Sequence, residues 1–159
     1  MKEYLTLLNY PLDVSVLLES ANTARLLAES YKDPRYPNLQ LDSWKISRYT
    51  DPYIEKIMSD FEIDGRPRFY WLEPFAVLPT HVDNATQCSI NLIISESPAP
   101  ITFNGNNYMY RQALLNTAIP HSVTNKSSER IMLKISIFNE TYAELANRIK
   151  YKLTEVSDN

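Results

Sequence analysis

The sequence contains few of the residues on which several classes of binding site depend. It has 2 glycines among 159 residues, so the glycine-rich loops that hold phosphates in P-loop and Rossmann proteins are absent. Its single cysteine, Cys88, excludes an internal disulfide and a cysteine-rich zinc site. A lone thiol suits a reducing compartment, and we expect a cytoplasmic protein. Ile90 and Leu92 follow Cys88 at alternate positions, which predicts a buried, inert thiol on a strand.

Long apolar runs and an excess of positive charge are also missing. No run of about 18 apolar residues exists, so we expect no membrane-spanning segment. The first residues, MKEYLTLLNYPLD, lack the apolar centre and the small-residue cleavage site of a signal peptide. The formal net charge of −3 argues against a broad nucleic-acid-binding face, because phosphate neutralisation needs clustered lysine and arginine.

The length and composition are those of one globular domain. A chain of 159 residues corresponds to about one domain, and its content of 44% hydrophobic and 22% charged residues is ordinary for a globular protein. We expect a single domain over residues 1–159. A mainly helical N-terminal region of about 1–65 is predicted to pack on a strand-rich core of about 66–138, followed by a C-terminal helix of about 139–153.

The N-terminal third contains two segments with helical periodicity. Over residues 13–31, apolar side chains recur at steps of three and four, and Asp13 is the predicted N-cap. A second helix is predicted to start at Asp51, with Pro52 in its first turn. Residues 39–49, between the two helices, are predicted to be extended. The apolar face of the second helix comprises Ile54, Ile57, Met58 and Phe61.

From about residue 68 the apolar pattern changes to the alternation typical of strands. Short extended segments follow one another, separated by proline and asparagine residues that favour turns. This spacing predicts a sandwich or barrel, so the fold class is mainly β with flanking helices (α+β). Asn139 is the predicted N-cap of the last helix. The predicted strands are 69–72, 75–83, 87–94, 101–103, 108–115, 121–124 and 130–138.

Both histidines of the chain fall in these predicted strands. His81 precedes Asp83 by two positions, and residues i and i+2 of a strand point to the same side. His121 lies in another predicted strand. Two imidazoles and one carboxylate form the facial triad of non-haem Fe(II) oxygenases, which leaves three positions of an octahedral ion open. The alternative explanation of His81 and Asp83 is a surface His-Asp pair. The alternative explanation of His121 is a hydrogen-bonded histidine at the end of a strand.

Arg130 follows His121 and opens the strand RIMLKISIF. A guanidinium can hold a carboxylate through two parallel hydrogen bonds, so Arg130 is a candidate anion-binding residue. An ion pair with Glu129 or another acid is the alternative. Asn91 and Tyr70 are weaker candidates for binding the same ligand, Asn91 as a donor to a carboxylate and Tyr70 through its hydroxyl.

Other polar and apolar residues of this region are assigned structural roles. Asn125 is expected to fix the turn before Arg130. Four lysines are expected on solvated faces: Lys126, Lys134, Lys150 and Lys152. Four apolar residues are expected to line the cavity of the predicted barrel or to belong to its core: Ile90, Leu92, Leu133 and Ile135.

The order His81-x-Asp83, His121 and Arg130 resembles that of the 2-oxoglutarate- and Fe(II)-dependent dioxygenases. The stretches FYWLEPFAVLPTHVDNATQCSINLII and IPHSVTNKSSERIMLKISI are most similar to the aspartyl/asparaginyl β-hydroxylase-like branch, and the likeness covers about residues 68–138. The resemblance implies a double-stranded β-helix (jelly-roll, cupin-like) for this region. It also implies that iron is held by His81, Asp83 and His121, and that Arg130 binds the distal carboxylate of the cosubstrate 2-oxoglutarate.

The function implied by the resemblance is a hydroxylase. Such an enzyme uses O2 and couples the decarboxylation of 2-oxoglutarate, which yields succinate and CO2, to the hydroxylation of a substrate. The sequence does not specify the substrate, and a protein or peptide side chain and a small metabolite are both candidates. Two alternatives stay open. A metal-dependent cupin enzyme would not use 2-oxoglutarate and would tolerate loss of Arg130, whereas a non-catalytic jelly-roll module would bind a carbohydrate or a partner protein without a metal.

Overall fold

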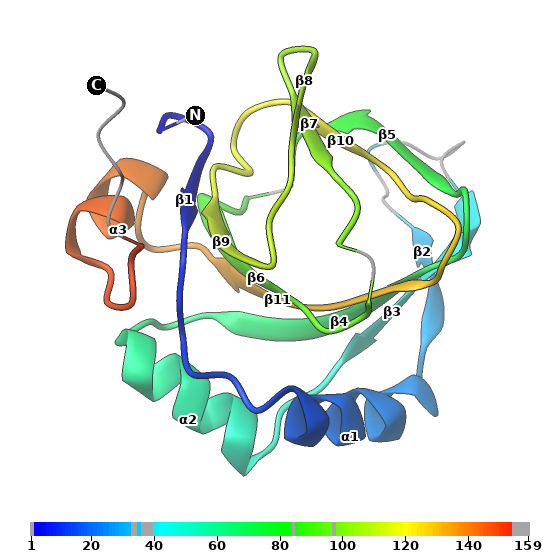
Figure 1. The fold of residues 1–159 in the computed structure, drawn as a ribbon, viewed down its shortest axis with the longest axis horizontal. Helices are drawn as coiled ribbons and strands as arrows, with labels where there is room; N and C mark the ends of the chain where they lie inside the picture. Colours follow the sequence, from blue (N-terminus) through cyan, green and yellow to red (C-terminus); the bar gives the residue numbers. More distant parts are fainter. Residues whose placement is uncertain (1, 33–34, 36–39, 84, 97, 154–159) are drawn as a thin grey trace.

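Two antiparallel sheets face each other in the computed structural model of the chain, which describes residues 2–32, 35, 40–83, 85–96 and 98–153. Two helices cover the outer face of the larger sheet, and a third lies beside its edge (Figure 1). Within these ranges, none of the helices has both the length and the apolar character that crossing a membrane requires.

The elements of the described residues are short and closely spaced. The larger sheet contains β1 (Leu5–Leu7), β2 (Glu29–Lys32), β3 (Gln40–Arg48), β4 (Arg66–Leu72), β6 (Cys88–Ile93), β9 (Gln112–Leu115) and β11 (Arg130–Ile137). The smaller sheet contains β5 (Val77–His81), β7 (Ile101–Phe103), β8 (Asn106–Tyr108) and β10 (His121–Thr124). The helices are α1 (Val14–Arg25), α2 (Pro52–Phe61) and α3 (Tyr142–Arg148).

The strand order is that of a double-stranded β-helix. The larger sheet has the order β1-β9-β6-β11-β4-β3-β2, and the smaller sheet has the order β5-β10-β7-β8. From β4 onward the chain alternates between the two sheets, except for the β7–β8 hairpin within the smaller one, so that strands distant in sequence become antiparallel neighbours. This arrangement confirms the predicted fold class, a mainly β jelly-roll with flanking helices.

The helices begin at capping residues but differ from the prediction at several ends. Asp13 caps α1 as predicted, accepting a hydrogen bond from Val16 N at 3.3 Å. The predicted helix over 13–31 is too long, because residues 29–32 pair with β3 as strand β2. Asp51 caps α2 as predicted. The predicted N-cap Asn139 is wrong for α3, which Thr141 begins with a capping box.

Two strand predictions also change. The predicted strand over 108–115 is two strands, because β8 ends at Tyr108 in the smaller sheet and β9 starts at Gln112 in the larger one. The predicted helical N-terminal region contributes β1, β2 and β3 to the larger sheet in addition to its two helices. Strand pairing across the molecule, rather than local periodicity, decides these segments.

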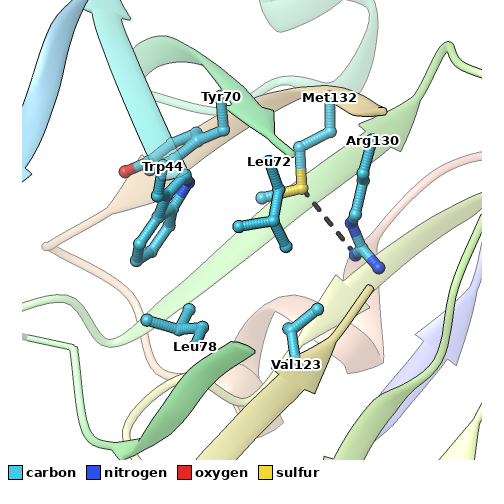
Figure 2. Close-up of a pocket in the computed structure, with 7 residues that line it drawn as sticks. All are labelled: Trp44, Tyr70, Leu72, Leu78, Val123, Arg130 and Met132. Atoms are coloured by element: carbon cyan, nitrogen blue, oxygen red, sulfur yellow. Dashed lines mark hydrogen bonds between the residues drawn. The ribbon is translucent and has the colours of Figure 1, made fainter. Parts of the chain in front are cut away.

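Apolar side chains pack on both faces of the larger sheet. One core lies between this sheet and the helices, and it contains Ile90, Leu92, Leu133 and Ile135, so these four residues are core and line neither of the cavities between the sheets. A second core lies between the two sheets. Figure 2 shows side chains of this inner core, with Arg130 and Met132 of β11 facing Leu78 and Val123 of the smaller sheet.

Candidate metal centre

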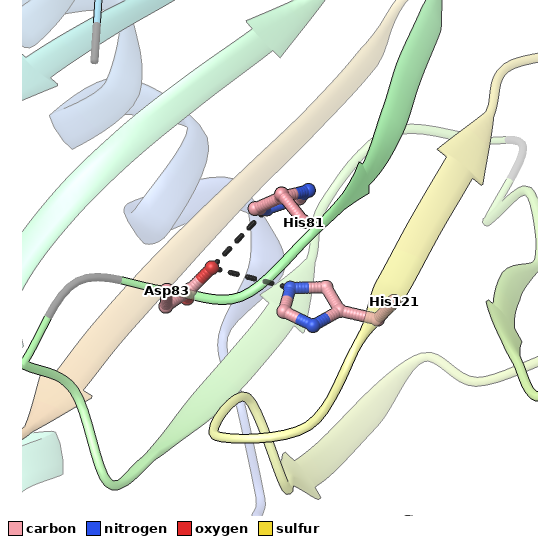
Figure 3. A group of neighbouring side chains, drawn as sticks. All are labelled: His81, Asp83 and His121. Carbon is pink, nitrogen blue, oxygen red and sulfur yellow. Dashed lines mark ion pairs between the residues drawn. The ribbon is translucent and has the colours of Figure 1, made fainter. Parts of the chain in front are cut away.

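His81, Asp83 and His121 meet at one end of the smaller sheet. His81 is the last residue of β5 and pairs in register with His121, the first residue of β10, so their ring centroids lie 4.4 Å apart. Asp83 follows β5 in a loop and is held there by its backbone N–H, which donates to Thr117 O at 3.2 Å. Figure 3 shows the three side chains pointing toward one another, and their donor atoms all lie within 4.8 Å of each other.

The two imidazoles present the same nitrogen to the carboxylate. His81 Nδ1 lies 2.8 Å from Pro79 O, and His121 Nδ1 lies 2.8 Å from Ile119 O. A carbonyl oxygen can only accept, so each Nδ1 carries a proton and each Nε2 of a neutral imidazole is left with its lone pair. Both Nε2 atoms lie 3.2 Å from Asp83 Oδ1. Two lone pairs and an anionic oxygen therefore face one another, an arrangement that a cation stabilises.

The spacing of these donor atoms suits a transition-metal ion. Ligands bound at about 2.1 Å on neighbouring corners of an octahedron are about 3 Å apart. The two N–O distances of 3.2 Å are close to that value. Two imidazole nitrogens and one carboxylate oxygen on the same side of an ion are the donor set of the non-haem Fe(II) facial triad. The residues present therefore fit iron.

Lys134 of β11 engages the other oxygen of Asp83. Its Nζ binds Asp83 Oδ2, and both side chains are largely buried. Burial alone raises the pKa of the Asp83 carboxyl, but the opposing effect of the neighbouring Lys134 ammonium prevails, and the pKa lies well below its usual range. Burial lowers the pKa of Lys134, and the Asp83 carboxylate more than reverses this and raises it. Asp83 is therefore ionised, with Oδ1 facing the imidazoles.

The expectation that Lys134 lies on a solvated face is wrong. The side chain is 13% exposed, because this position of β11 faces the space between the two sheets. Its ammonium also lies 5.7 Å from the centre of the Tyr70 ring, across the β4–β11 pair. No sequence motif marks Lys134, and only the closure of the smaller sheet over β11 shows that this position faces the interior.

Arg130 is buried at the start of β11, in the same space between the sheets. Its guanidinium donates to Pro98 O at 2.8 Å, to Ala99 O at 3.0 Å and to Tyr110 Oη at 2.8 Å. It also approaches Met132 Sδ at 3.9 Å (Figure 2). Three of the four contacts thus use oxygen acceptors of the protein, and the fourth uses a thioether, which is a weak acceptor.

The alternative ion pair between Arg130 and Glu129 does not form. Glu129 instead pairs with Arg25 of α1 through two hydrogen bonds of 2.9 and 2.7 Å. The two neighbouring residues thus point to opposite sides of the larger sheet, Glu129 toward the helices and Arg130 toward the smaller sheet.

Asn91 and Tyr110 form a polar cluster with Arg130. Asn91 Nδ2 donates to Tyr110 Oη at 3.1 Å and approaches Met132 Sδ at 3.7 Å. Ser89 Oγ donates to Asn91 Oδ1 at 2.9 Å, which fixes the amide. Tyr110 joins Asn91 to Arg130, a role that sequence reasoning missed because an alternating tyrosine has an adequate explanation as a strand residue.

Two cavities adjoin between the larger sheet and the triad. The smaller measures about 20 Å³ and lies against Arg130 and Met132 (Figure 2). The larger measures about 380 Å³ and is bordered by His81 and Asp83. Tyr70 and Trp44 line both cavities. Arg130 therefore borders one cavity, His81 and Asp83 border the other, and two aromatic side chains are common to both.

The comparisons with known proteins agree with this architecture. Neither a protein-family model nor a curated protein matches the sequence. A prolyl-4-hydroxylase from Pseudomonas putida is similar in structure, with a TM-score of 0.62 and 12% identity over 86% of this chain and 91% of that chain. A viral collagen prolyl hydroxylase from Paramecium bursaria Chlorella virus-1, in complex with 2-oxoglutarate, has a TM-score of 0.53 and 9% identity over 77% of this chain and 87% of that chain. The chain therefore shares the fold of these two hydroxylases.

Proposed function

We propose that the protein is a 2-oxoglutarate- and Fe(II)-dependent hydroxylase in which His81, Asp83 and His121 hold the iron. The observation that carries this proposal is the convergence of two imidazole Nε2 atoms on Asp83 Oδ1, each at 3.2 Å, from separate parts of the chain. The order of the motif in the sequence and the fold shared with two prolyl hydroxylases support the same function.

Arg130 is the proposed partner of the distal carboxylate of 2-oxoglutarate. A carboxylate is a far better acceptor than the Met132 thioether, so it would take over that contact with the guanidinium. The cavity at Arg130 measures about 20 Å³, roughly the room of one water molecule, so binding requires Met132 to move. An unbranched methionine adapts readily. We assign Asn91 to the same carboxylate, because it shares Met132 with Arg130, and Tyr70 to the cavity wall.

The protein's own contribution is to orient the donors and to exclude water. When bound, iron and 2-oxoglutarate supply the oxidising chemistry, in which O2 is consumed, succinate and CO2 are released and the substrate gains a hydroxyl group. The carbonyls of Pro79 and Ile119 hold the Nδ1 protons and so keep both Nε2 atoms available. Lys134 keeps Asp83 ionised and turns one oxygen toward the imidazoles.

Anaerobic titration with Fe(II) and 2-oxoglutarate tests the proposal. The wild-type protein should develop a weak visible charge-transfer band, and His81→Ala and His121→Ala should abolish it. Asn147→Ala, an exposed change in α3, is the matched control and should leave the band intact. A wild-type protein that binds no iron and gives no band would show that the function is not the one proposed.

Arg130→Met separates this function from that of a metal-dependent cupin enzyme. In a 2-oxoglutarate-dependent enzyme the variant should still bind iron but should need far more 2-oxoglutarate to consume oxygen. A cupin enzyme that does not use the cosubstrate would consume oxygen equally with and without it. A non-catalytic jelly-roll module would contain no metal after purification without chelators.

The assignments of the family branch and of the substrate class rest on the sequence motif. We place the enzyme in the aspartyl/asparaginyl β-hydroxylase-like branch, with a protein or peptide side chain as the first substrate to test, by incubating candidate peptides and measuring the gain of one oxygen atom by mass spectrometry. The lone buried thiol of Cys88 suits the proposed cytoplasmic location, where thiols stay reduced.

A further inference from the structure

The cavity of about 380 Å³ beside the triad is strongly basic. Among its lining residues, Asp83 supplies the one carboxylate, and that carboxylate already binds Lys134 and faces the two imidazoles. The described part of the chain therefore contributes to this cavity a large excess of positive charge. The cationic side chains that line it are Lys32, Arg48, Arg66, Arg68 and Lys134.

Strand register places the cations in a row. Arg48 of β3 lies directly opposite Arg68 of β4, and Arg68 lies directly opposite Lys134 of β11. Residues opposite one another on neighbouring strands share a face of the sheet, where like charges repel. Arg66, two positions before Arg68, adds a further cation to that face. Such a row is unfavourable for the empty sheet, and an anion bound against it removes the repulsion.

The guanidinium groups of this row have donors available. Within the described ranges of the chain, no carboxylate forms an ion pair with Arg48, Arg66 or Arg68. Arg68 Nε is buried and donates to no protein acceptor there. The Arg66 guanidinium lies 4.9 Å from the centre of the Phe138 ring, which holds it at the cavity wall without using its hydrogen-bond donors.

Aromatic rings lie on the same face of the larger sheet, next to the row of cations. Tyr31 stacks on Trp44 with ring centroids 4.2 Å apart, and Trp44 lies 5.2 Å from the Tyr70 ring. A volume of about 380 Å³ is within the range of small-molecule sites. The cavity thus offers arginine forks and flat apolar surfaces next to one another on one wall, beside His81 and Asp83.

We infer that this cavity binds the substrate of the proposed hydroxylase, and that this substrate carries at least two negative charges as carboxylate or phosphate groups. Arg48, Arg66 and Arg68 would hold those groups, because planar guanidinium forks match both kinds of oxyanion through paired hydrogen bonds. The rest of the substrate would then lie along the aromatic wall next to the triad. The assignment of the bound anion as the substrate rests on the proposed function. The anion-binding site itself is inferred from the residues that line the cavity and does not depend on that function.

Trp44 provides a direct measure of occupancy. It lines the cavity, whereas Trp71 lies in the core beneath the helices, so binding should change the fluorescence of one of the two tryptophans. We would titrate metal-free protein at low salt with tripolyphosphate and, separately, with tricarballylate, and measure fluorescence and heat. Binding of one probe in preference to the other identifies phosphate or carboxylate chemistry, and added salt should weaken it.

Two variants and a control connect the binding to the row of cations. Arg68→Gln should weaken probe binding about 10- to 100-fold, in line with the loss of charge-assisted hydrogen bonds. Arg48→Gln should also weaken probe binding. Because Arg48 is exposed, this substitution is not expected to disturb folding. Lys126→Gln removes one positive charge from an exposed position outside the cavity and should leave the affinity unchanged.

The outcomes separate this inference from the proposed function. If neither probe binds, or if the arginine variants bind as well as wild type, the anion site is refuted, even where the Fe(II)–2-oxoglutarate band is present. If 2-oxoglutarate displaces the probe from metal-free protein with the same dependence on Arg68, the cavity belongs to the cosubstrate and the substrate assignment is overturned. Probe binding in a protein that never gives the band refutes the hydroxylase function and, with it, that assignment.

Discussion

At the scale of single residues, hydrogen bonds to one atom of each triad side chain determine which atom faces the centre of the site. The Nδ1 atoms of His81 and His121 donate to backbone carbonyls, and Asp83 Oδ2 binds Lys134. One nitrogen or one oxygen of each side chain is left to face the centre. Contacts of this kind, outside the ligand atoms themselves, orient metal ligands and set their affinity. The hydrogen-bond partners of the triad therefore support its assignment as a candidate metal site as much as the three residues themselves do.

The buried Lys134–Asp83 pair gives the first prediction at this scale. Lys134→Met leaves a carboxylate 9% exposed without its cation, so the metal-free variant should lose about 3–5 kcal/mol in its free energy of unfolding. The double variant Asp83→Asn with Lys134→Met removes both charges and should recover much of that loss. Urea unfolding of the wild type, both single variants and the double variant measures the coupling. Additive effects would show that the two groups do not interact.

The lowered pKa of Asp83 gives a second prediction, which concerns the stability of the protein at acid pH. In the unfolded chain this carboxyl takes up a proton near pH 3.9, whereas in the folded protein it does so only at lower pH. Its contribution to stability is therefore complete above the unfolded value and is lost as the pH falls toward the folded one. Between about pH 5 and pH 2, the unfolding free energy of the wild type should fall more steeply than that of Asp83→Asn. Parallel curves for the two proteins would contradict the assignment.

At the scale of elements, the turn between β10 and β11 decides where Arg130 lies. The buried Asn125 side chain donates to Leu72 O, Glu73 O and Ser128 O at 2.9–3.0 Å and accepts from Lys126 N at 2.9 Å. These contacts tie the turn to the end of β4, so they fix the start of β11. The expectation that Asn125 holds this turn is confirmed.

Asn125→Ala should therefore destabilise the protein by about 2–4 kcal/mol, because it leaves buried carbonyl groups without a donor. Thermal or urea unfolding measures the loss. Asn147→Ala makes the same chemical change at an exposed position of α3 and should be nearly neutral. Equal stability of the two variants would show that the side-chain contacts of Asn125 contribute little.

Element boundaries were predictable where the signal is local. Asp51 followed by Pro52 marks the start of α2, and the strand from His121 to Thr124 was predicted with its observed ends. The end of α1 was not, because apolar residues continue at helical spacing as far as Tyr31, while pairing with β3 makes that stretch a strand. A partner distant in the sequence overrides periodicity there.

The candidate site was predictable to the extent that its residue types are rare. The chain has two histidines, so their convergence with Asp83 could be expected from a motif, and the structure brings the three together. Lys134 could not be found in this way. Both faces of β11 are largely buried, so the alternation of the sequence does not show that this lysine faces the interior rather than water. Only the closure of the second sheet over β11 determines that.

At the scale of the whole molecule, the proposed activity needs both sheets. The smaller sheet supplies the two histidines, whereas the larger one supplies Arg130, Lys134 and the row of arginines on β3 and β4. The space between the sheets thus has the candidate metal ligands on one side and a row of cations on the other. A metal would contact the histidines of the smaller sheet, whereas a cosubstrate and an anionic substrate would contact the larger sheet, which links binding to the stability of the jelly-roll as a unit.

Metal binding should consequently stabilise the folded chain as a whole. A ligand that binds only the folded state adds about 2.7 kcal/mol at a free concentration of 100 times its Kd. For a chain of 159 residues this corresponds to a rise of roughly 5–10 °C in Tm, measured with Fe(II) under anaerobic conditions or with Co(II) as an air-stable substitute. His121→Ala should show no such rise, while Asn147→Ala should match the wild type. His121 is one of the proposed ligands and lies beside His81 on the adjacent strand of the smaller sheet. A rise in Tm that persists in His121→Ala would therefore show that the metal binds at a site other than the triad.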